Sequence, residues 1–377
     1  MFKLVDISVS IAGIKFKNPV LTAAGPMSRN GEILLEAAKN GAGGLVTKTV
    51  APKPAIVPRP CMAIMNLNET VPKGFLNAEE WSDIPYEQWL EKEYEIAKKS
   101  GLPIIASLGH SAEAARMLGP LIEKKGVNAI ELVTIYSGID PSPVAEATKA
   151  LKEVVSIPVF VKLSPNYFDI VAFAKAVEKA GADAITAVDS LGPCLAIDIE
   201  TAKPVLGGKY GYGWLSGPAL KPYALRCVAD ITRAVKIPVI GVGGIMSGKD
   251  AIEYIMVGAY AVEICTGAIL KGPSIYGNVA KEIEEFLRKH GYDSLEDIRG
   301  LALKHLPEKP LRTKAIPPNV FQEKCTMCFI CQRTCPYKAI SIKKPPIDGK
   351  KVFIDIEKCY GCGLCVSVCP VRAIHWD

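Results

Sequence analysis

The chain has 377 residues, of which 49% are apolar and 7% aromatic, and its 45 Lys+Arg against 39 Asp+Glu give a net charge of +6. This composition excludes a disordered chain, and the length suits an α/β barrel of about 250 residues with a smaller domain attached. The mean hydropathy is +0.20, but no uncharged apolar run approaches the roughly 18 residues of a spanning helix, which predicts a cytoplasmic protein with no membrane partner.

Short apolar runs alternate with amphipathic stretches along the first 290 residues. The runs lie at 20–25, 43–50, 104–109, 129–134, 159–164, 184–190, 239–244 and 261–267. Each is continuously apolar, as strands buried on both faces of a parallel sheet are. Eight strand–helix units predict the α/β class and a (β/α)8 TIM barrel over residues 1–305. An open doubly wound sheet is the competing architecture, although such a sheet seldom runs through eight regular repeats without a topological break.

Two long insertions interrupt these repeats, at residues 51–100 and 191–220. They follow the second and sixth predicted strands, so they belong to the C-terminal face, where barrel enzymes carry their active sites. We therefore expect Asn66 and the segment GGKYGYGW to contribute to a lid or a substrate pocket. Surface decoration is the alternative for both loops.

Eight of the twelve cysteines lie in residues 322–377, where C-x2-C-x2-C-x3-C-P occurs twice. Three thiolates of each such run hold one cubane, and the fourth holds the other cluster. The motif predicts a bacterial-ferredoxin-like domain at 322–377 with two [4Fe–4S] clusters, joined to the barrel by a linker at 306–321. One cluster is assigned to Cys325, Cys328, Cys331 and Cys369, and the other to Cys335, Cys359, Cys362 and Cys365. Zinc is the alternative, but zinc sites separate their C-x2-C pairs by longer loops.

The basic charge of this cysteine-rich segment is explained by its cofactors. Residues 322–377 contain nine Lys/Arg and five Asp/Glu, and each oxidised cubane with four thiolates adds a charge of about −2. The excess of basic residues compensates this charge. We therefore expect no nucleic-acid partner.

Glycines end the last two predicted strands, at Gly243 and Gly244 and again at Gly267 after Thr266. Their backbone amides would lie where (β/α)8 barrels bind a phosphate, although strand-end glycines also occur in simple turns. Two lysines, Lys48 in VTKTV and Lys162 in VKLSPN, end apolar barrel strands. Burying a lysine there is costly unless it meets an anion or an electron-rich ring.

The segments NPVLTAAG, VTKT, FVKLSPN, WLSGPALKP, GVGGI and EICTGAIL together resemble the FMN barrel shared by dihydroorotate and dihydropyrimidine dehydrogenases. The resemblance covers about residues 5–290. With the double cluster motif behind the barrel, the chain is similar to the pyrimidine-reducing half of dihydropyrimidine dehydrogenases. It implies FMN as a cofactor, contacted by Ala24, Lys48, Thr49, Lys162, Gly217, Gly243, Gly244, Cys265, Thr266 and Gly267. Lys162 would face the N1/O2 side of the flavin, where a cation favours the reduced ring.

The substrate motif departs from the pattern of these families. Val133 stands where they have an Asn, and Tyr136 where they have a Cys or Ser. The Asn-Thr pair after the sixth strand is Asp189-Ser190, and only Asn66 remains of the polar set that would bracket a pyrimidine. Because an unpaired buried polar group costs about 1–3 kcal/mol, this pattern predicts a substrate other than a normal pyrimidine. A true dihydropyrimidine or dihydroorotate dehydrogenase subunit and a non-catalytic electron-relay subunit are the alternatives.

Two residues compete for the role of proton donor. Tyr136 takes the place of the acid in the resembled families, and His110 follows the third strand on the same face. Each also fits a purely structural role. Asp189, Glu131 and Cys194 are weaker candidates: Glu131 lies within a strand and fits a pairing role inside the barrel, and Cys194 fits a buried thiol.

These features predict an oxidoreductase that acts on a C–C or C=C bond of a small molecule. Two clusters would pass electrons between FMN and an external carrier. The chain has no G-x-G-x-x-G after a first strand, so NAD(P)H oxidation would need a partner flavoprotein subunit, and ferredoxin is the other donor. A homo- or hetero-oligomer is expected.

Overall fold

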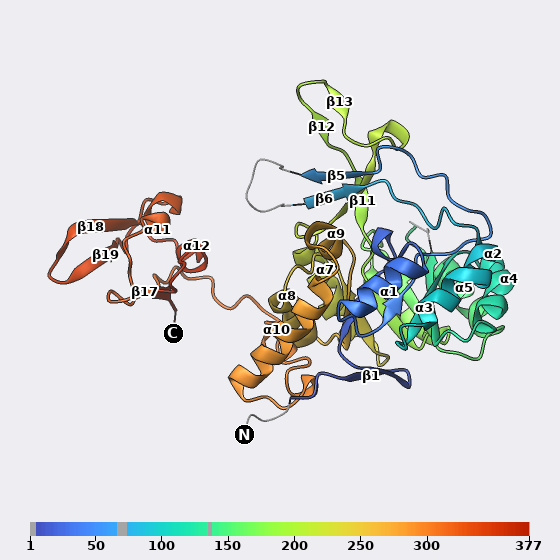
Figure 1. Cartoon of the computed structure of the whole chain (residues 1–377). Helices are drawn as coiled ribbons and strands as arrows, with labels where there is room; N and C mark the ends of the chain where they lie inside the picture. The colour runs from blue at the N-terminus through green and yellow to red at the C-terminus, as the bar shows by residue number, and fades with distance from the viewer. Residues whose placement is uncertain (1–4, 66–73, 135–137, 377) are drawn as a thin grey trace. The chain divides into compact units, whose positions relative to one another are not determined.

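The computed structural model describes residues 5–65, 74–134 and 138–376. The chain divides into two compact units, residues 1–305 and residues 306–377, which are described separately (Figure 1). Residues 306–321, which were predicted as a linker, belong to the second unit by this division.

Eight parallel strands form the barrel of the first unit. They are β3 (Val20–Thr22), β4 (Leu45–Val46), β7 (Ile104–His110), β8 (Ala129–Thr134), β9 (Val159–Leu163), β10 (Ala184–Ala187), β15 (Val239–Val242) and β16 (Ala261–Ile264). The sheet order is β3-β16-β15-β10-β9-β8-β7-β4. The two end strands meet where Thr22 N donates to Gly44 O at 3.3 Å, beside a parallel bridge between Leu21 and Gly44. The predicted TIM barrel is thereby confirmed, and the open doubly wound sheet is wrong.

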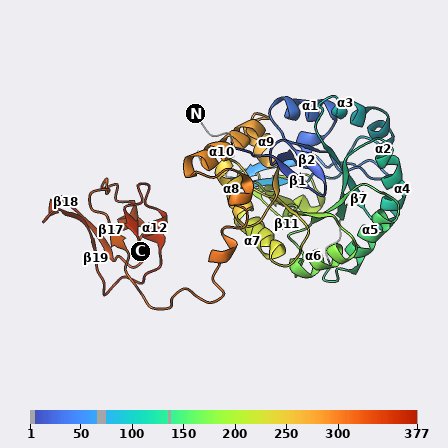
Figure 2. The ribbon, with the colours of Figure 1, turned by 90° about the horizontal axis from the view of Figure 1, so that it is seen from below.

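Helices surround the strands on the outside of the barrel (Figure 2). They are α1 (Gly31–Lys39), α4 (Ala112–Glu123), α5 (Ser142–Lys152), α6 (Ile170–Lys179), α7 (Lys221–Thr232), α8 (Gly248–Met256), α9 (Thr266–Lys271) and α10 (Ile275–His290). Short polar side chains begin several of them: Asn30, Ser111 and Ser247 accept hydrogen bonds from amides of the first turn. The inner helix faces are apolar and pack on the strands.

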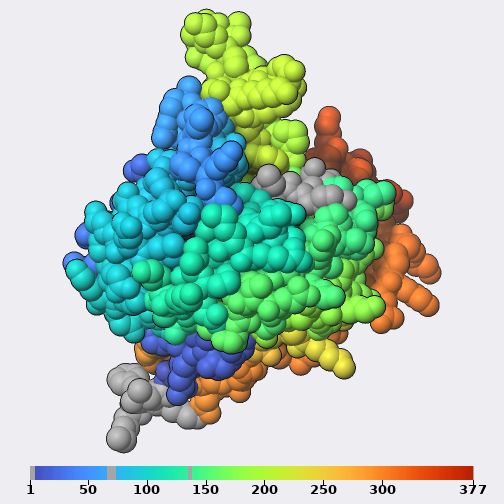
Figure 3. Space-filling view, turned by 90° about the vertical axis from the view of Figure 1, so that its right-hand side faces the viewer, coloured from blue at the N-terminus to red at the C-terminus, as the bar shows by residue number. Residues whose placement is uncertain are grey.

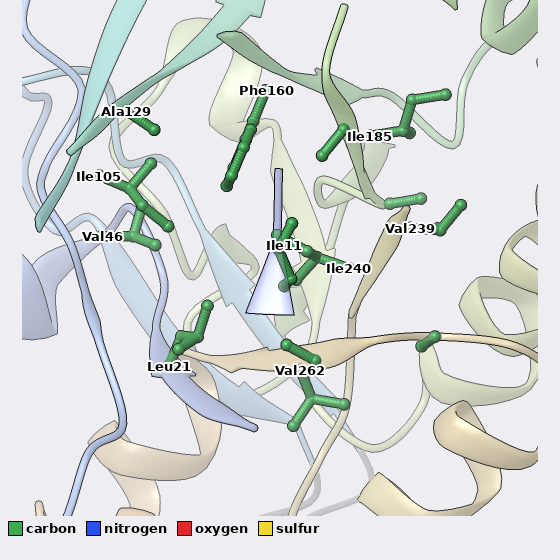
Figure 4. Packing of buried hydrophobic residues seen from close by; sticks show 14 of the residues in the cluster. Ile11, Leu21, Val46, Ile105, Ala129, Phe160, Ile185, Val239, Ile240 and Val262 are labelled. Carbon is green, nitrogen blue, oxygen red and sulfur yellow. The ribbon is translucent and has the colours of Figure 1, made fainter. Parts of the chain in front are cut away.

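A small hairpin closes the N-terminal end of the barrel. It is formed by β1 (Val9–Ile11) and β2 (Ile14–Phe16). Ile11 is fully buried and lies at the centre of a ring of strand residues that includes Leu21 and Phe160 (Figure 4). The barrel interior is therefore packed at this end, and its C-terminal end is left for a site.

The two predicted insertions meet in a second sheet above the C-terminal end. Its order is β11-β14-β6-β5, from β5 (Met62–Met65), β6 (Gly74–Asn77), β11 (Leu191–Cys194) and β14 (Gly213–Ser216). Leu76, Ala78 and Leu206 form its buried core. An arm of β12 (Ile197–Asp198) and β13 (Lys203–Pro204) stands out from the barrel and is the yellow-green projection in Figure 3. The first insertion continues through α2 (Tyr86–Gln88), a π-helical turn (Trp89–Glu93) and α3 (Tyr94–Lys98).

The second unit has little regular structure. It contains β17 (Asn319–Val320), α11 (Ile330–Thr334), β18 (Ile340–Ile347), β19 (Lys350–Ile354), α12 (Leu364–Ser367) and β20 (Ile374–His375). Among its described residues, the buried apolar cluster consists of Cys331, Ile340, Ile342, Val352 and Ile374. A core this small calls for additional cross-links, such as metal clusters. In neither unit is any described helix long and apolar enough to cross a membrane.

Candidate active site and cluster sites

A cavity of about 280 Å³ opens at the C-terminal ends of the barrel strands. Its floor and walls come from the ends of the barrel strands, and the insertion sheet adds residues from β6 and β14. The position is the one at which barrel enzymes hold their substrates. All ten residues predicted to contact a flavin line this single cavity: Ala24, Lys48, Thr49, Lys162, Gly217, Gly243, Gly244, Cys265, Thr266 and Gly267.

Some of the predicted substrate and proton-transfer residues also line this cavity. His110, Val133, Asp189 and Ser190 line the same cavity. Tyr136 and Asn66 lie outside the described residues. Val133, only 8% exposed, presents an apolar surface where the related families carry an amide.

Glycines line one wall of the cavity, so that its main chain can lie directly against a ligand. Gly217 and Gly244 have φ of +73° and +68°, a region that other residues rarely adopt. A Cβ on Gly244 would lie 2.6 Å from the carbonyl oxygen of Gly217, and one on Gly267 would lie 2.4 Å from that of Ile245. No larger residue fits at these positions without a backbone shift, so this wall presents bare main chain.

Lys162 lies at the floor of the cavity with a side chain that is 4% exposed. Its Nζ is 3.6 Å from Glu263 Oε2 and 3.9 Å from Glu131 Oε1. Burial alone would lower the pKa of this ammonium, but attraction to the negatively charged Glu131–Glu263 pair outweighs burial and raises the pKa above its ordinary value. Lys162 is therefore a fixed positive charge beneath any ligand in the cavity.

The other predicted lysine is already paired. Lys48 Nζ donates to Glu79 Oε2 at 2.7 Å, and the side chains are 6% and 16% exposed. The second oxygen of Glu79 accepts from the Cys61 thiol at 3.4 Å. Beside this pair, the hydroxyls of Thr49 and Ser107 are 2.9 Å apart. The lysine and its carboxylate together present a polar but nearly charge-balanced wall.

His110 lines the same cavity. Neither ring nitrogen has a hydrogen bond of good geometry within the described residues, and the ring meets Trp81 edge to face at 4.9 Å between centroids. Burial lowers the pKa of His110 below its ordinary 6.5. The imidazole is thus neutral at pH 7 and free to accept a proton.

Several cavity residues were not selected from the sequence. Glu79, Glu80 and Trp81 follow β6 and reach the cavity from the first insertion. Burial raises the pKa of the Glu80 carboxyl. The only sequence signal for these residues was the acidic and aromatic run EEWSD inside a long insertion on the C-terminal face. Asn166, which also lines the cavity, is the last residue of the FVKLSPN segment but was not singled out.

The eight clustered cysteines of the second unit surround two separate cavities, each of about 20 Å³. One is lined by Cys325, Cys328, Cys331 and Cys369, and the other by Cys335, Cys359, Cys362 and Cys365. These are the crossed groups predicted from the motif. Among the described residues no three His, Cys, Asp or Glu side chains close around a single metal-ion position. The sulfurs surround a space, as ligands of a cluster do.

A local twofold relationship connects the two groups. The amide of Ala339 donates to Cys335 Sγ at 3.4 Å, and that of Ala373 donates to Cys369 Sγ at 3.2 Å. These are the two cysteines that cross to the opposite group. Amide hydrogen bonds to sulfur favour thiolates and tune the potential of an iron–sulfur cluster.

The barrel cavity fits a flavin mononucleotide. Bare main chain at Gly244 and Gly267 suits a phosphate, the small wall at Ala23 and Ala24 leaves room for a flat ring, and Lys162 offers a buried cation. Fold and site together define a flavin-dependent barrel oxidoreductase that carries an iron–sulfur module.

Comparisons with known proteins agree. The sequence model described as Dihydroorotate dehydrogenase matches residues 134–287, and that described as 4Fe-4S dicluster domain matches residues 324–373. A protein of Methanosarcina mazei named "Dihydroorotate dehydrogenase B (NAD(+)), catalytic subunit" is 40% identical over 307 residues, 78% of this chain and 94% of that protein. The proteins of the same name from Pyrococcus abyssi and Thermoplasma acidophilum are 38% and 35% identical, over 79% and 80% of this chain and 99% and 100% of theirs.

The chain belongs to the dihydroorotate dehydrogenase family, whose members are FMN-dependent oxidoreductases acting on CH–CH groups. The resemblance read from the barrel segments and the double cysteine motif is thereby confirmed. About a fifth of the chain lies outside the match to each of these relatives.

Proposed function

We propose that the chain is the catalytic subunit of an FMN- and iron–sulfur-dependent enzyme that interconverts a dihydropyrimidine and the corresponding pyrimidine, with dihydroorotate as the first candidate substrate. The observation that carries the proposal is the Lys162 ammonium at the floor of a glycine-walled cavity. Relatives named as dihydroorotate dehydrogenase catalytic subunits, matched over nearly their whole length, favour this alternative over the predicted non-pyrimidine substrate.

FMN would be held along the cavity by the residues selected from the sequence. The phosphate would lie against the main chain of Gly244 and Gly267, and the ring over Lys162. When bound, FMN supplies the ring atom that accepts or donates a hydride. The positive charge of Lys162 stabilises negative charge that develops on the side of the ring facing it.

Oxidation of the substrate removes a hydride from one carbon and a proton from its neighbour, so the chain must provide a base. His110 is neutral, lines the cavity and has no competing hydrogen bond of good geometry in the described part of the chain. It can accept the proton at a ring nitrogen and return it in the reverse direction. Tyr136 remains the rival because it replaces the acid of the resembled families.

The two cysteine groups would hold two [4Fe–4S] clusters that carry electrons singly between the flavin and an external carrier. The relatives are named as catalytic subunits and as NAD(+) enzymes, which favours a hetero-oligomer with an NAD(P)H-oxidising flavoprotein subunit; ferredoxin is the other carrier. All twelve cysteines are unpaired, which suits a reducing compartment, and we place the protein in the cytoplasm.

One observation favours a second candidate, a substrate that is not a normal pyrimidine. Val133 presents an apolar surface to the cavity, and Asp189 accepts a hydrogen bond from the amide of Ser190 at 2.7 Å. A ring with several donors and acceptors has fewer amide partners here than in the resembled families.

The test is turnover by anaerobically purified protein with an artificial electron acceptor. Dihydroorotate, dihydrouracil, dihydrothymine and a panel of saturated acids related to enoates are compared. The proposal expects a dihydropyrimidine to be oxidised, and expects His110→Gln to reduce turnover by about 10²–10⁴ while flavin content is kept. If Tyr136→Phe has that effect instead, the base is Tyr136. Oxidation of saturated acids alone supports the second candidate. If no compound is oxidised, the proposal is wrong and the chain is better explained as a non-catalytic electron-relay subunit.

A further inference from the structure

Three charged side chains meet inside the barrel, at the inner end of the cavity. Glu131 lies on β8, Lys162 on the neighbouring β9, and Glu263 on β16. In the closed order of eight strands, β16 lies opposite β8. Both glutamates nevertheless lie within 4 Å of the Lys162 ammonium, so all three side chains point to the barrel axis.

The trio is almost entirely buried and poorly hydrogen-bonded. The Glu131 and Glu263 side chains are fully buried, and none of their four carboxylate oxygens has a hydrogen-bond partner among the described residues. One ammonium cannot neutralise two carboxylates, and an uncompensated charge in a barrel core is strongly unfavourable. A single proton between the two carboxylates would make the trio neutral.

We propose that Glu131 and Glu263 share one proton in the oxidised enzyme and take up a second when negative charge arrives above Lys162, so that the trio is a proton site balancing the charge of the flavin. The proposal deepens the proposed function and rests on it, because the arriving charge is that of the reduced cofactor. Lys162 is the residue through which the two positioning glutamates act.

The charges balance in both states. In the oxidised state one ammonium, one carboxylate and one carboxylic acid sum to zero. Reduction places one negative charge beside Lys162, and a proton taken from solvent converts the remaining carboxylate to an acid, which restores zero. The proton comes from solvent by way of the cavity, which Lys162 and Glu263 both line, and returns there on reoxidation.

The other ionisable groups near Lys162 are less suited to take up this proton than Glu131 and Glu263. Asp189 and Cys265 also lie close to Lys162, and the Asp189 carboxylate adds to the attraction that raises the pKa of the ammonium. Lys48 acts on Cys265 from the end of β4 and is itself paired with Glu79. Burial keeps the Cys265 thiol and His110 neutral, because it raises the pKa of the thiol to about 11 and lowers that of the imidazole. Burial and the Glu131 carboxylate together raise the pKa of Glu263 well above its ordinary value.

Infrared spectroscopy tests the first half of the proposal on the oxidised full-length protein at pH 7, with and without its flavin. Differences between wild type and variant isolate the carbonyl stretch of a protonated carboxylic acid. We expect that band in the wild type and expect both Glu263→Gln and Glu131→Gln to remove it, since either remaining glutamate then ionises against Lys162. Glu93→Gln is the control: Glu93 is equally buried, but its oxygens accept from Gly31 N and Gln88 Nε2.

Reductive titration tests the second half by counting protons taken up per two electrons. We expect the wild type and each single variant to take up one proton more than the double variant Glu131→Gln/Glu263→Gln. A band absent from the wild type, a band that survives in both single variants, or equal proton counts in the wild type and the double variant would overturn the proposal. The infrared result in flavin-free protein stands independently of turnover, so a failure of the proposed function is recognised separately.

Discussion

The Lys48 ammonium donates to Glu79 Oε2 at 2.7 Å inside the cavity, so the lysine that ends the second barrel strand is already paired before a substrate arrives. Any anionic group that approaches Lys48 must compete with that carboxylate. The Lys48–Glu79 pair therefore sets how well the site accepts a substrate that carries a carboxylate, as dihydroorotate does.

Replacing Glu79 by Gln should strengthen binding of orotate, because the substitution removes the competing negative charge. We expect roughly a tenfold gain in affinity, which corresponds to about 1.4 kcal/mol. A titration with orotate, followed by the change in flavin absorbance, measures it. Glu95→Gln is the control, since Glu95 forms a 2.8 Å pair with Lys98 on the surface. Unchanged or weaker orotate binding in Glu79→Gln would remove this pair from substrate selection.

Gly244→Ala should lower the flavin content of the purified protein by roughly tenfold or more, a loss of about 1.4 kcal/mol in binding. The new Cβ would lie 2.6 Å from Gly217 O and 2.8 Å from the Lys221 Cβ, and it would strain a residue at φ +68°. Gly291→Ala separates the two effects, because Gly291 has φ +76° with nothing within 4 Å of its Cβ position. Equal flavin content in the two variants would mean that the glycine-lined wall at Gly244 does not hold the cofactor.

The cysteine groups predict a crossed pattern of cluster loss. The wild type should contain about eight irons, and Cys369→Ala should damage the cluster held by the first cysteine run, which lies far from it in sequence. Iron analysis and electron paramagnetic resonance of anaerobic samples follow each cluster. Cys227→Ala, a buried cysteine on α7, should keep all the iron. Selective loss of the cluster held by the second run in Cys369→Ala would refute the crossing.

The barrel should lose stability in mild acid because of His110. Burial lowers the pKa of this histidine below 6.5, so on acidification the unfolded chain binds a proton before the folded chain does. The contribution of His110 to the free energy of unfolding is complete above about pH 6.5 and falls as the pH drops toward the folded pKa. In His110→Phe the midpoint of thermal unfolding should decline less between about pH 7.5 and about pH 5.5 than in the wild type. An identical decline in the two proteins would show that His110 is not held neutral.

The barrel could be predicted from the sequence because each strand is buried on both faces and is therefore mostly apolar, as at 239–242. Lys48 and Lys162 were recognisable because each is a charge near the end of such a run. The glycine wall was predictable for the same reason, since strand-end glycines fall at one known position of a barrel.

The rest of the site could not be predicted, because it depends on contacts between residues far apart in the sequence, which a local sequence pattern does not indicate. Glu79 and Trp81 reach the cavity only because β6 pairs with β14, some 140 residues later in the chain. Glu131 and Glu263 meet only because β8 and β16 lie on opposite sides of the closed barrel and both side chains point inward. The sequence indicated a pairing role for Glu131, from its place within a strand, but not its partner. The substrate prediction relied on Val133, Tyr136 and the Asp189-Ser190 pair, and the match to relatives over nearly their whole length favours the dihydropyrimidine alternative.

The proposed oxidation of a dihydropyrimidine is best tested by a single-turnover experiment with anaerobic, oxidised protein and stoichiometric dihydroorotate or dihydrouracil, in which flavin absorbance is followed after mixing. We expect that one of these dihydropyrimidines bleaches the flavin, that the matching pyrimidine forms in equal amount, and that Lys162→Met slows the bleaching by about 10²-fold or more. If dithionite bleaches the flavin but neither dihydropyrimidine does, the cavity above Lys162 is not a pyrimidine site, and the chain is not a dihydropyrimidine-oxidising subunit.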